Sequence, residues 1–173
     1  MKRPLSVEAA KRAAYDLLSR KAWSRRELTA RLVQRGAPET VARDVVAELE
    51  ARGYVDDQAF ARQWAERRTG RRSLGSRRLS AELDLKGIAR SQAASAIREA
   101  FSGTGEEAQA LEAGRRRLAA LQRQNPGRAP VRLRDYLLRR GYPPEIVSQV
   151  MRRLVKLEDS DAESVPGSPV PRS

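Results

Sequence analysis

The chain has 173 residues, a formal net charge of +13, and neither cysteine nor histidine. These absences exclude disulfides and cysteine-based zinc sites, and they remove the commonest general base and transition-metal ligand. No apolar run approaches the eighteen or so residues that span a bilayer, and the N-terminus lacks the apolar stretch of a secretory signal. We therefore expect a cytoplasmic protein without a membrane segment.

The positive charge lies in the body of the chain. Four acids of the last sixteen residues against one arginine give that tail a charge of −4 + 1 = −3, so the preceding body carries +16. A body this basic indicates a polyanion or an acidic protein as partner. A genome composition that favours arginine codons would also raise the number of arginines. The charge alone therefore does not decide between a functional basic surface and a compositional bias.

A pair of helices joined at a glycine is predicted early in the chain. Leu28 and Leu32 lie four residues apart, on one helix face. Gly36 follows, and glycine is the residue that most readily takes the left-handed conformation that ends a helix. Pro38 suits the first turn of the next helix, because its missing N–H breaks no bond there. The apolar face of that second helix is formed by Val41, Val45 and Leu49.

Capping residues mark the neighbouring helix starts. A first helix is expected over residues 8–20, and Ser24 with Glu27 forms a capping box for the helix that carries Leu28. Asp56 is a good N-cap, and Asp57 adds a second acid at the positive end of the helix dipole. Two adjacent acids also occur at metal or acid–base sites, but neighbours in a helix do not face each other, which favours capping.

The same spacing of two leucines, a glycine and a second group of apolar residues recurs twice in the chain. This recurrence indicates stacked helical repeats instead of one layered core. About 51 positions on, it consists of Leu79, Leu83, Gly87, Ala96, Ile97, Ala100 and Phe101. About 105 positions on, it consists of Leu133, Leu137, Gly141, Ile146, Val150 and Leu154. A turn is expected over residues 69–76, a hinge over residues 102–105 and a loop from Asn125 to Pro130.

We therefore predict an all-α protein of three tandem three-helix repeats with a disordered C-terminal tail. The expected parts are a flexible start at 1–7, repeats at 8–55, 56–102 and 106–157, and an acidic, Pro/Ser-rich tail at 158–173. The tail is too polar to offset the entropy cost of ordering it.

These motifs together resemble the RecX family, the bacterial regulators of the RecA recombinase. The resemblance covers residues 8–157. The matching residues of the second repeat are Gly53-Tyr54-Val55-Asp56-Asp57 with Phe60, Arg67-Arg68, Gly75, Leu79, Leu83 and Gly87-Ile88. Those of the first repeat are Leu17-Leu18, Arg20, Ser24, Glu27-Leu28 and Leu32, and those of the third are Tyr136-Leu137 and Arg140-Gly141-Tyr142.

The resemblance implies an elongated, curved array that is not an enzyme and needs no cofactor. Such proteins bind along the groove of the RecA–DNA filament or at its growing end, and they dampen strand exchange, ATP hydrolysis and coprotease function. This places the protein in DNA repair, recombination and the SOS response to DNA damage. We expect a monomer whose partners are the RecA filament and, through weak, salt-sensitive contacts, single- and double-stranded DNA.

The candidate contact residues are basic side chains of repeats two and three. The alternative for each of these residues is that its charge is solvated and has no role in binding. Trp23 and Trp64 are alternative platforms for unpaired bases; core packing is the better reading of Trp64, and a hydrophobic staple with Leu28 is a reading of Trp23. The basic candidates are Arg67, Arg68, Arg71, Arg72, Arg77, Arg78, Lys86, Arg115, Arg116 and Arg117.

Two other functions compete with this one. A general DNA-binding helical array that acts without RecA explains the charge equally well, because helix–turn–helix units occur in DNA-binding proteins. A metal-dependent nuclease would need carboxylates clustered in space from different helices. The acids of this chain lie at helix starts or scattered on helix faces, which disfavours the nuclease.

Overall fold

The computed structural model describes residues 4–162, without the side chains of residues 71 and 155–162. Within this range the chain forms nine α-helices, one short 3₁₀ helix and no strand. The helices are α1 (Val7–Leu18), α2 (Arg25–Gln34), α3 (Glu39–Ala51), α4 (Asp57–Arg72), α5 (Ser76–Leu85), α6 (Arg90–Phe101), α7 (Glu106–Gln124), η1 (Pro126–Arg128), α8 (Ala129–Arg139) and α9 (Pro144–Ala162).

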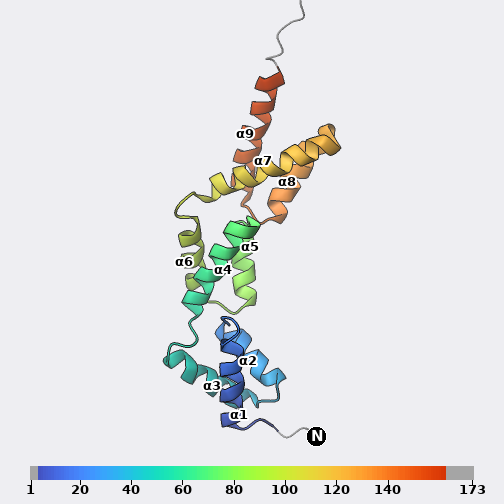
Figure 1. The fold of residues 1–173 in the computed structure, drawn as a ribbon. Helices are drawn as coiled ribbons and strands as arrows, with labels where there is room; N and C mark the ends of the chain where they lie inside the picture. The colour runs from blue at the N-terminus through green and yellow to red at the C-terminus, as the bar shows by residue number, and fades with distance from the viewer. Residues whose placement is uncertain (1–3, 163–173) are drawn as a thin grey trace, which may run out of the picture. The chain divides into compact units, whose positions relative to one another are not determined.

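The helices form three successive groups of three, as predicted. Figure 1 shows them along the colour ramp: α1–α3 (repeat 1) run from blue to teal, α4–α6 (repeat 2) from teal to olive, and α7–α9 (repeat 3) from gold to red. Gly36, Gly87 and Gly141 end the second helix of each repeat, and their φ angles are 98°, 76° and 85°. The three in-frame glycines are therefore helix stops, because their backbone conformation is one that L side chains rarely adopt.

Each repeat has its own hydrophobic core. In repeat 1 Leu28, Leu32 and Val45 are buried together, and in repeat 3 Leu133 and Leu137 are buried with Val150. The core of repeat 2 is formed by smaller side chains with two larger ones; it comprises Phe60, Ala61, Ala65, Leu83, Ile88, Ala93 and Ala96. The residues that recur in the sequence are thus core residues of their repeats.

Several helix starts follow the predicted caps. The Ser24 hydroxyl accepts the amide of Glu27, and the Asp56 carboxylate accepts the amide of Ala59. Inside the loop expected from Asn125 to Pro130, the Asn125 side chain accepts the amide of Arg128 and so caps the short helix η1.

The turn expected over residues 69–76 is shorter than predicted, because α4 runs on to Arg72. The buried Thr69 hydroxyl donates to the carbonyl groups of Ala65 and Glu66, which keeps this threonine inside the helix. At the other end of the chain, α9 continues to Ala162. The rest of the predicted tail, residues 163–173, lies outside the described residues, as do residues 1–3 of the expected flexible start.

The chain divides into two compact units. Unit 1 comprises residues 4–72 and 79–103, and unit 2 comprises residues 73–78 and 104–162. Helix α5 therefore begins in unit 2 and continues in unit 1.

Within unit 1, the start of α2 docks on the end of α5. The Ser24 hydroxyl donates to the carbonyl oxygen of Lys86 at 2.7 Å, and the Lys86 ammonium lies 2.7 Å from the Glu27 carboxylate. The amide of Arg25 donates to Asp57 at the start of α4. Repeats 1 and 2 are thus joined by polar contacts at helix ends.

Within unit 2, the segment before α5 docks in a similar way on the end of α8. The amide of Gly75 donates to the carbonyl of Arg140 at 2.9 Å, and the amide of Arg77 donates to that of Gly141 at 3.0 Å. The hydroxyl of Tyr142 donates to the carbonyl of Ser73 at 2.9 Å. The same type of contact, a helix start against a glycine turn, therefore occurs twice in the chain.

Candidate partner-binding surface

The ten basic residues predicted from the sequence fall into both units. In unit 1 are Arg67, Arg68, Arg71, Arg72 and Lys86; in unit 2 are Arg77, Arg78, Arg115, Arg116 and Arg117. The side chain of Arg71 lies outside the described residues. The other nine differ in how far they are committed to contacts within the protein.

Arg68 and Lys86 stabilise the interior of unit 1. The Arg68 guanidinium lies 3.2 Å from the Glu82 carboxylate and 4.3 Å from the centre of the Trp64 ring. The Lys86 ammonium pairs with Glu27 and lies 4.0 Å from the same ring. Only 20% and 17% of these two side chains is exposed. Breaking partly buried ion pairs of this kind costs stability, so both are poor candidates for contact with a partner.

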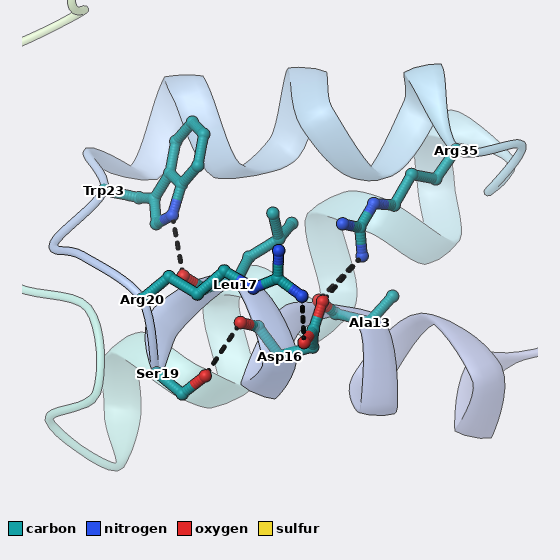
Figure 2. A network of polar contacts seen from close by, with 7 residues as sticks. All are labelled: Ala13, Asp16, Leu17, Ser19, Arg20, Trp23 and Arg35. Atoms are coloured by element: carbon teal, nitrogen blue, oxygen red, sulfur yellow. Dashed lines mark hydrogen bonds and ion pairs between the residues drawn. The ribbon is translucent and has the colours of Figure 1, made fainter.

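Both tryptophans are committed to the fold as well. The indole N–H of Trp64 donates to Glu82 at 3.0 Å, and its ring stacks on Phe60 with 5.8 Å between centres. The indole N–H of Trp23 donates to the carbonyl of Leu17 at 3.0 Å and so ties the start of α2 to the end of α1 (Figure 2). The Trp23 ring packs against the core of repeat 1. Neither ring is placed as an open platform for a base.

Asp16 anchors the same region from the other side of α1. Its carboxylate accepts hydrogen bonds from Arg20 at 2.9 Å and from Arg35 at 3.4 Å, as Figure 2 shows. The hydrogen bond from Arg20 is the main reason why the pKa of Asp16 lies below its usual value. Arg20 and Arg35 are therefore paired within repeat 1.

In unit 1, Arg67 and Arg72 are the exposed members of the predicted set whose side chains the structure describes. Both lie on α4, and the Arg67 guanidinium donates to the carbonyl of Gln63 at 3.2 Å, one turn earlier in the helix. They lie on one helix.

Unit 2 brings its predicted arginines together. The guanidinium of Arg78 donates to the carbonyl of Arg139 at 3.1 Å, and that of Arg116 donates to the hydroxyl of Ser73 at 3.4 Å. The guanidinium of Arg117 lies 5.6 Å from the centre of the Tyr136 ring. Arg115 is exposed next to these residues on α7.

Sequence reasoning did not include Arg139 and Arg140 among the candidate contact residues, although both belong to the same cluster. The Arg140 guanidinium lies 5.0 Å from the centre of the Tyr136 ring, so two guanidinium groups flank one aromatic ring. A signal was present in the sequence, because a basic residue precedes the glycine stop of every repeat: Arg35, Lys86 and Arg140. Cations are favoured at helix C-termini. We call Arg77, Arg78, Arg116, Arg117, Arg139 and Arg140 the arginine cluster.

Carboxylates also lie beside the arginine cluster. Glu112 lies 3.6 Å from Arg116, and Glu106 accepts the amide of Ser76 at 2.7 Å. Tyr142 remains uncharged, because burial raises its pKa to about 12. The six arginines of this cluster attract phosphates and acidic protein surfaces.

A hollow of about 930 Å³ in unit 1 was not predicted from the sequence. It is lined by α2, α3 and the starts of α4 and α6, and its walls carry charges of both signs: Arg25, Arg26, Arg43, Glu39, Glu50, Asp56 and Asp57. Arg25 pairs with Glu50, and Arg43 pairs with Glu39. The lining is therefore mixed in charge.

The described residues hold no group of three or more potential metal-ligating acids. Nor does the described part of the chain include a helix that is long and apolar enough to cross a membrane. What the geometry offers in unit 2 is a charged surface for binding.

Comparison with known proteins agrees with this architecture. Models of the first, second and third three-helix domains of RecX match residues 10–49, 56–97 and 105–151. A regulatory protein RecX from Mycobacterium avium is 33% identical over 149 residues, which is 86% of each chain. A regulatory protein RecX from Thermobifida fusca is 36% identical over 150 residues, covering 86% of this chain and 77% of that protein. The fold is similar to a crystal structure of RecX from Lactobacillus salivarius, with a TM-score of 0.74 and 15% identity over 86% of this chain and 96% of that one.

Proposed function

The chain belongs to the RecX family, and we propose that it regulates the RecA recombinase by binding the RecA–DNA filament. The expected effect is mainly inhibition of recombinase, ATPase and coprotease activity. In this proposal the protein works as a cytoplasmic monomer and catalyses no reaction itself.

The observation that carries the proposal is the arginine cluster of unit 2. It combines six arginines from α5, α7 and the C-terminal end of α8, two of which, Arg117 and Arg140, flank the ring of Tyr136. Such a surface complements the DNA phosphates and acidic protein surface of a nucleoprotein filament. Planar guanidinium groups also bind phosphate and carboxylate in bidentate fashion, which gives the contact direction as well as charge.

The alternative, a DNA-binding helical array that acts without RecA, is disfavoured by the charge of α3. In a helix–turn–helix module the helix after the turn enters the major groove. In repeat 1 that helix carries one arginine, Arg43, against four acids, Glu39, Asp44, Glu48 and Glu50, a charge of 1 − 4 = −3. A helix with this charge is repelled by the phosphates that line the groove. Repeat 1 therefore does not suit major-groove reading.

A pair of charge reversals tests the proposal. Arg116→Glu with Arg117→Glu changes the cluster by four charges, and Arg90→Glu with Arg98→Glu makes the same change on exposed positions of α6. We expect the first variant to need at least about ten times more protein to inhibit RecA ATPase and strand exchange, the equivalent of about 1.4 kcal/mol. The matched α6 variant should shift the inhibition curve by less than about threefold.

Two results would count against the proposal. Equal shifts for both variants would mean that net charge, and not the cluster, governs binding. If the wild-type protein leaves RecA ATPase and strand exchange untouched at concentrations near that of RecA, regulation of RecA is excluded. The DNA-binding alternative is checked by binding to bare DNA at rising salt, since a phosphate-driven complex weakens by powers of ten over a fourfold salt increase.

A further inference from the structure

The glycine turns that end α2, α5 and α8 are not covered alike. The start of α2 lies on the turn after α5, where the Ser24 hydroxyl donates to the carbonyl of Lys86 at 2.7 Å. The start of α5 lies on the turn after α8, where the amide of Arg77 donates to the carbonyl of Gly141 at 3.0 Å. At the turn after α2, in contrast, a Cβ built at Gly36 would have no atom beyond its chain neighbours within 4 Å in the described part of the chain. This turn is the open one of the three.

The two covered turns show how closely a helix start approaches. A Cβ at position 87 would lie 2.7 Å from Cβ of Arg26, and a Cβ at position 141 would overlap Cβ of Arg78. In both places the start of one helix lies directly against the end of another. The contact is electrostatically favourable, because a helix is partially positive at its N-terminus and partially negative at its C-terminus. The end of α2 offers a helix start the same attraction.

Residues 4–6, which we call the strap, occupy the open turn only in part. The amide of Leu5 donates to the carbonyl of Gly36 at 3.0 Å, just as the amide of Arg77 does to that of Gly141. The side chain of Leu5 is partly buried against the core of repeat 1. The strap therefore takes the carbonyl of the open turn but leaves the face of the glycine uncovered.

The start of α8 is the helix start that corresponds to those of α2 and α5. Val131 lies two residues before the first recurring leucine of its repeat, as Arg77 does in repeat 2. Its side chain is 63% exposed, and its amide lies in the first turn of α8, where N–H groups have no partner within the helix. The preceding proline has no N–H, and the amide of Ala129 donates to the carbonyl of Pro126. One amide donor and one apolar side chain thus remain at this helix start.

We propose that the turn at Gly36 is a docking site for the start of α8 of a second copy of this chain, and that the strap keeps this site closed in the free protein. In the docked state the Val131 amide donates to the Gly36 carbonyl in place of the Leu5 amide, and the Val131 side chain covers the glycine. The contact continues the series of docked helix starts from one copy into the next, head to tail. It shares no residue with the arginine cluster.

The contact between copies is weaker than those inside the chain. It has one donor, whereas the start of α5 donates two amides, those of Gly75 and Arg77, to the turn after α8. A strap attached to the same chain competes with it at high effective concentration. The strap therefore suffices to keep the free protein monomeric, and it acts as an autoinhibitory contact.

The test opens the turn by removing one residue. Deletion of residues 2–5 removes Leu5 and keeps Ser6, the cap of α1, whereas deletion of residues 2–4 is the matched control that keeps Leu5. Sedimentation velocity over a concentration series measures self-association of the protein alone. We expect the control to stay monomeric and the protein without Leu5 to associate at least about tenfold more tightly. Leu5→Pro removes only the amide donor and keeps an apolar side chain, so it should also promote association and serves as the test if the deletion does not fold.

Substitutions at Val131 test the other side of the contact. In the protein without Leu5, Val131→Asp places a carboxylate against the negative end of α2 and should restore the monomer. Val131→Arg introduces the residue type of Arg26 and Arg77 and should keep the association. Mixing the Val131→Asp protein that lacks Leu5 with the deletion 2–4 control should give a complex of one copy of each that does not grow, because each copy then has one functional end.

Two results would overturn the proposal. One is a monomer at every concentration for an opened protein whose circular dichroism melting curve shows that it is folded. The other is association that persists unchanged with Val131→Asp, because a different surface would then be responsible. RecA is absent from these measurements, so their failure does not bear on the proposed regulation of RecA.

Discussion

The three in-frame glycines provide a graded test of the docking contacts. Gly36, Gly87 and Gly141 all have positive φ, so alanine at any of them adopts a backbone conformation that costs roughly 1–2 kcal/mol. If helix termination were their only role, all three alanine variants would lose about the same stability.

The surroundings of the three glycines differ, and so should the losses. A Cβ at position 36 would have no atom within 4 Å. At position 87 it would lie 2.5 Å from Cδ of Arg26, which can move, and 2.7 Å from Cβ of the same residue, which is held by α2. At position 141 it would overlap Cβ of Arg78 and lie 2.5 Å from the backbone nitrogen of that residue, which is held in α5.

We therefore expect the cost to rise in the order Gly36, Gly87, Gly141. Overpacking against fixed atoms adds typically about 1–3 kcal/mol. Gly36→Ala should lower the free energy of unfolding by roughly 1–2 kcal/mol and Gly141→Ala by roughly 2–5 kcal/mol, with Gly87→Ala between them. Urea unfolding followed by circular dichroism measures these values. A loss for Gly36→Ala as large as that for Gly141→Ala would refute the reasoning, because it would show that the docked segment does not constrain the glycine.

Three further predictions concern single side chains. Lys86→Met should lower the free energy of unfolding by about 1–2 kcal/mol, because it leaves the partly buried carboxylate of Glu27 without the ammonium group that lies 2.7 Å away. Urea unfolding followed by tryptophan fluorescence measures this loss, and an unchanged unfolding midpoint would contradict the prediction. Burial raises the pKa of Asp57 above the value it has in the unfolded chain, so ionisation of this carboxyl group lowers the stability of the wild type as pH rises. The stability of Asp57→Asn relative to wild type should therefore rise between pH 4 and pH 7. A flat difference in urea unfolding across that range would count against burial as the cause. Tyr142→Phe should cost about 1 kcal/mol through the lost hydrogen bond to Ser73, and it should remove a loss of stability that the wild type shows as pH rises from 10 towards 12, which melting curves at alkaline pH would detect.

The sequence predicts the interior of the repeats well because the governing rules are local. Spacing of apolar residues and glycine stops identified Leu28, Leu32 and Gly36 and their two copies, and the structure confirms them as core and helix ends. Ser24 is likewise a cap. Each of these signals depends on residues within one or two helical turns.

The polar contacts between distant segments could not be predicted in this way. Glu27 was expected to complete a capping box with Ser24, but its carboxylate pairs with Lys86, which lies 59 residues further along the chain. Sequence spacing gives no information on which helix ends meet. The same limit applies to the link from Arg78 to the carbonyl of Arg139, and therefore to the arginine cluster.

The glycine stops also explain why helix ends serve as the joints of this chain. A residue without Cβ that ends a helix leaves the last carbonyl groups uncovered, so a donor from another segment can approach them. Lys86 and Gly141 accept such donors from Ser24 and Arg77, respectively. At the corresponding turn of repeat 1, the carbonyl of Gly36 accepts the amide of Leu5 at 3.0 Å.

The start of the chain therefore occupies the position that a preceding helix start takes at the other two turns. This use of the recurring pattern of core residues and glycine stops limits which side chains are available to a partner. Core residues, glycine stops and the carbonyls beside them are all used within the protein, and so are Arg68 and Lys86. The arginine cluster of unit 2, in contrast, consists of side chains that differ between the repeats. Under the proposed function, exchanging these arginines should therefore weaken partner binding, whereas exchanging a glycine stop should weaken the docking of helix ends.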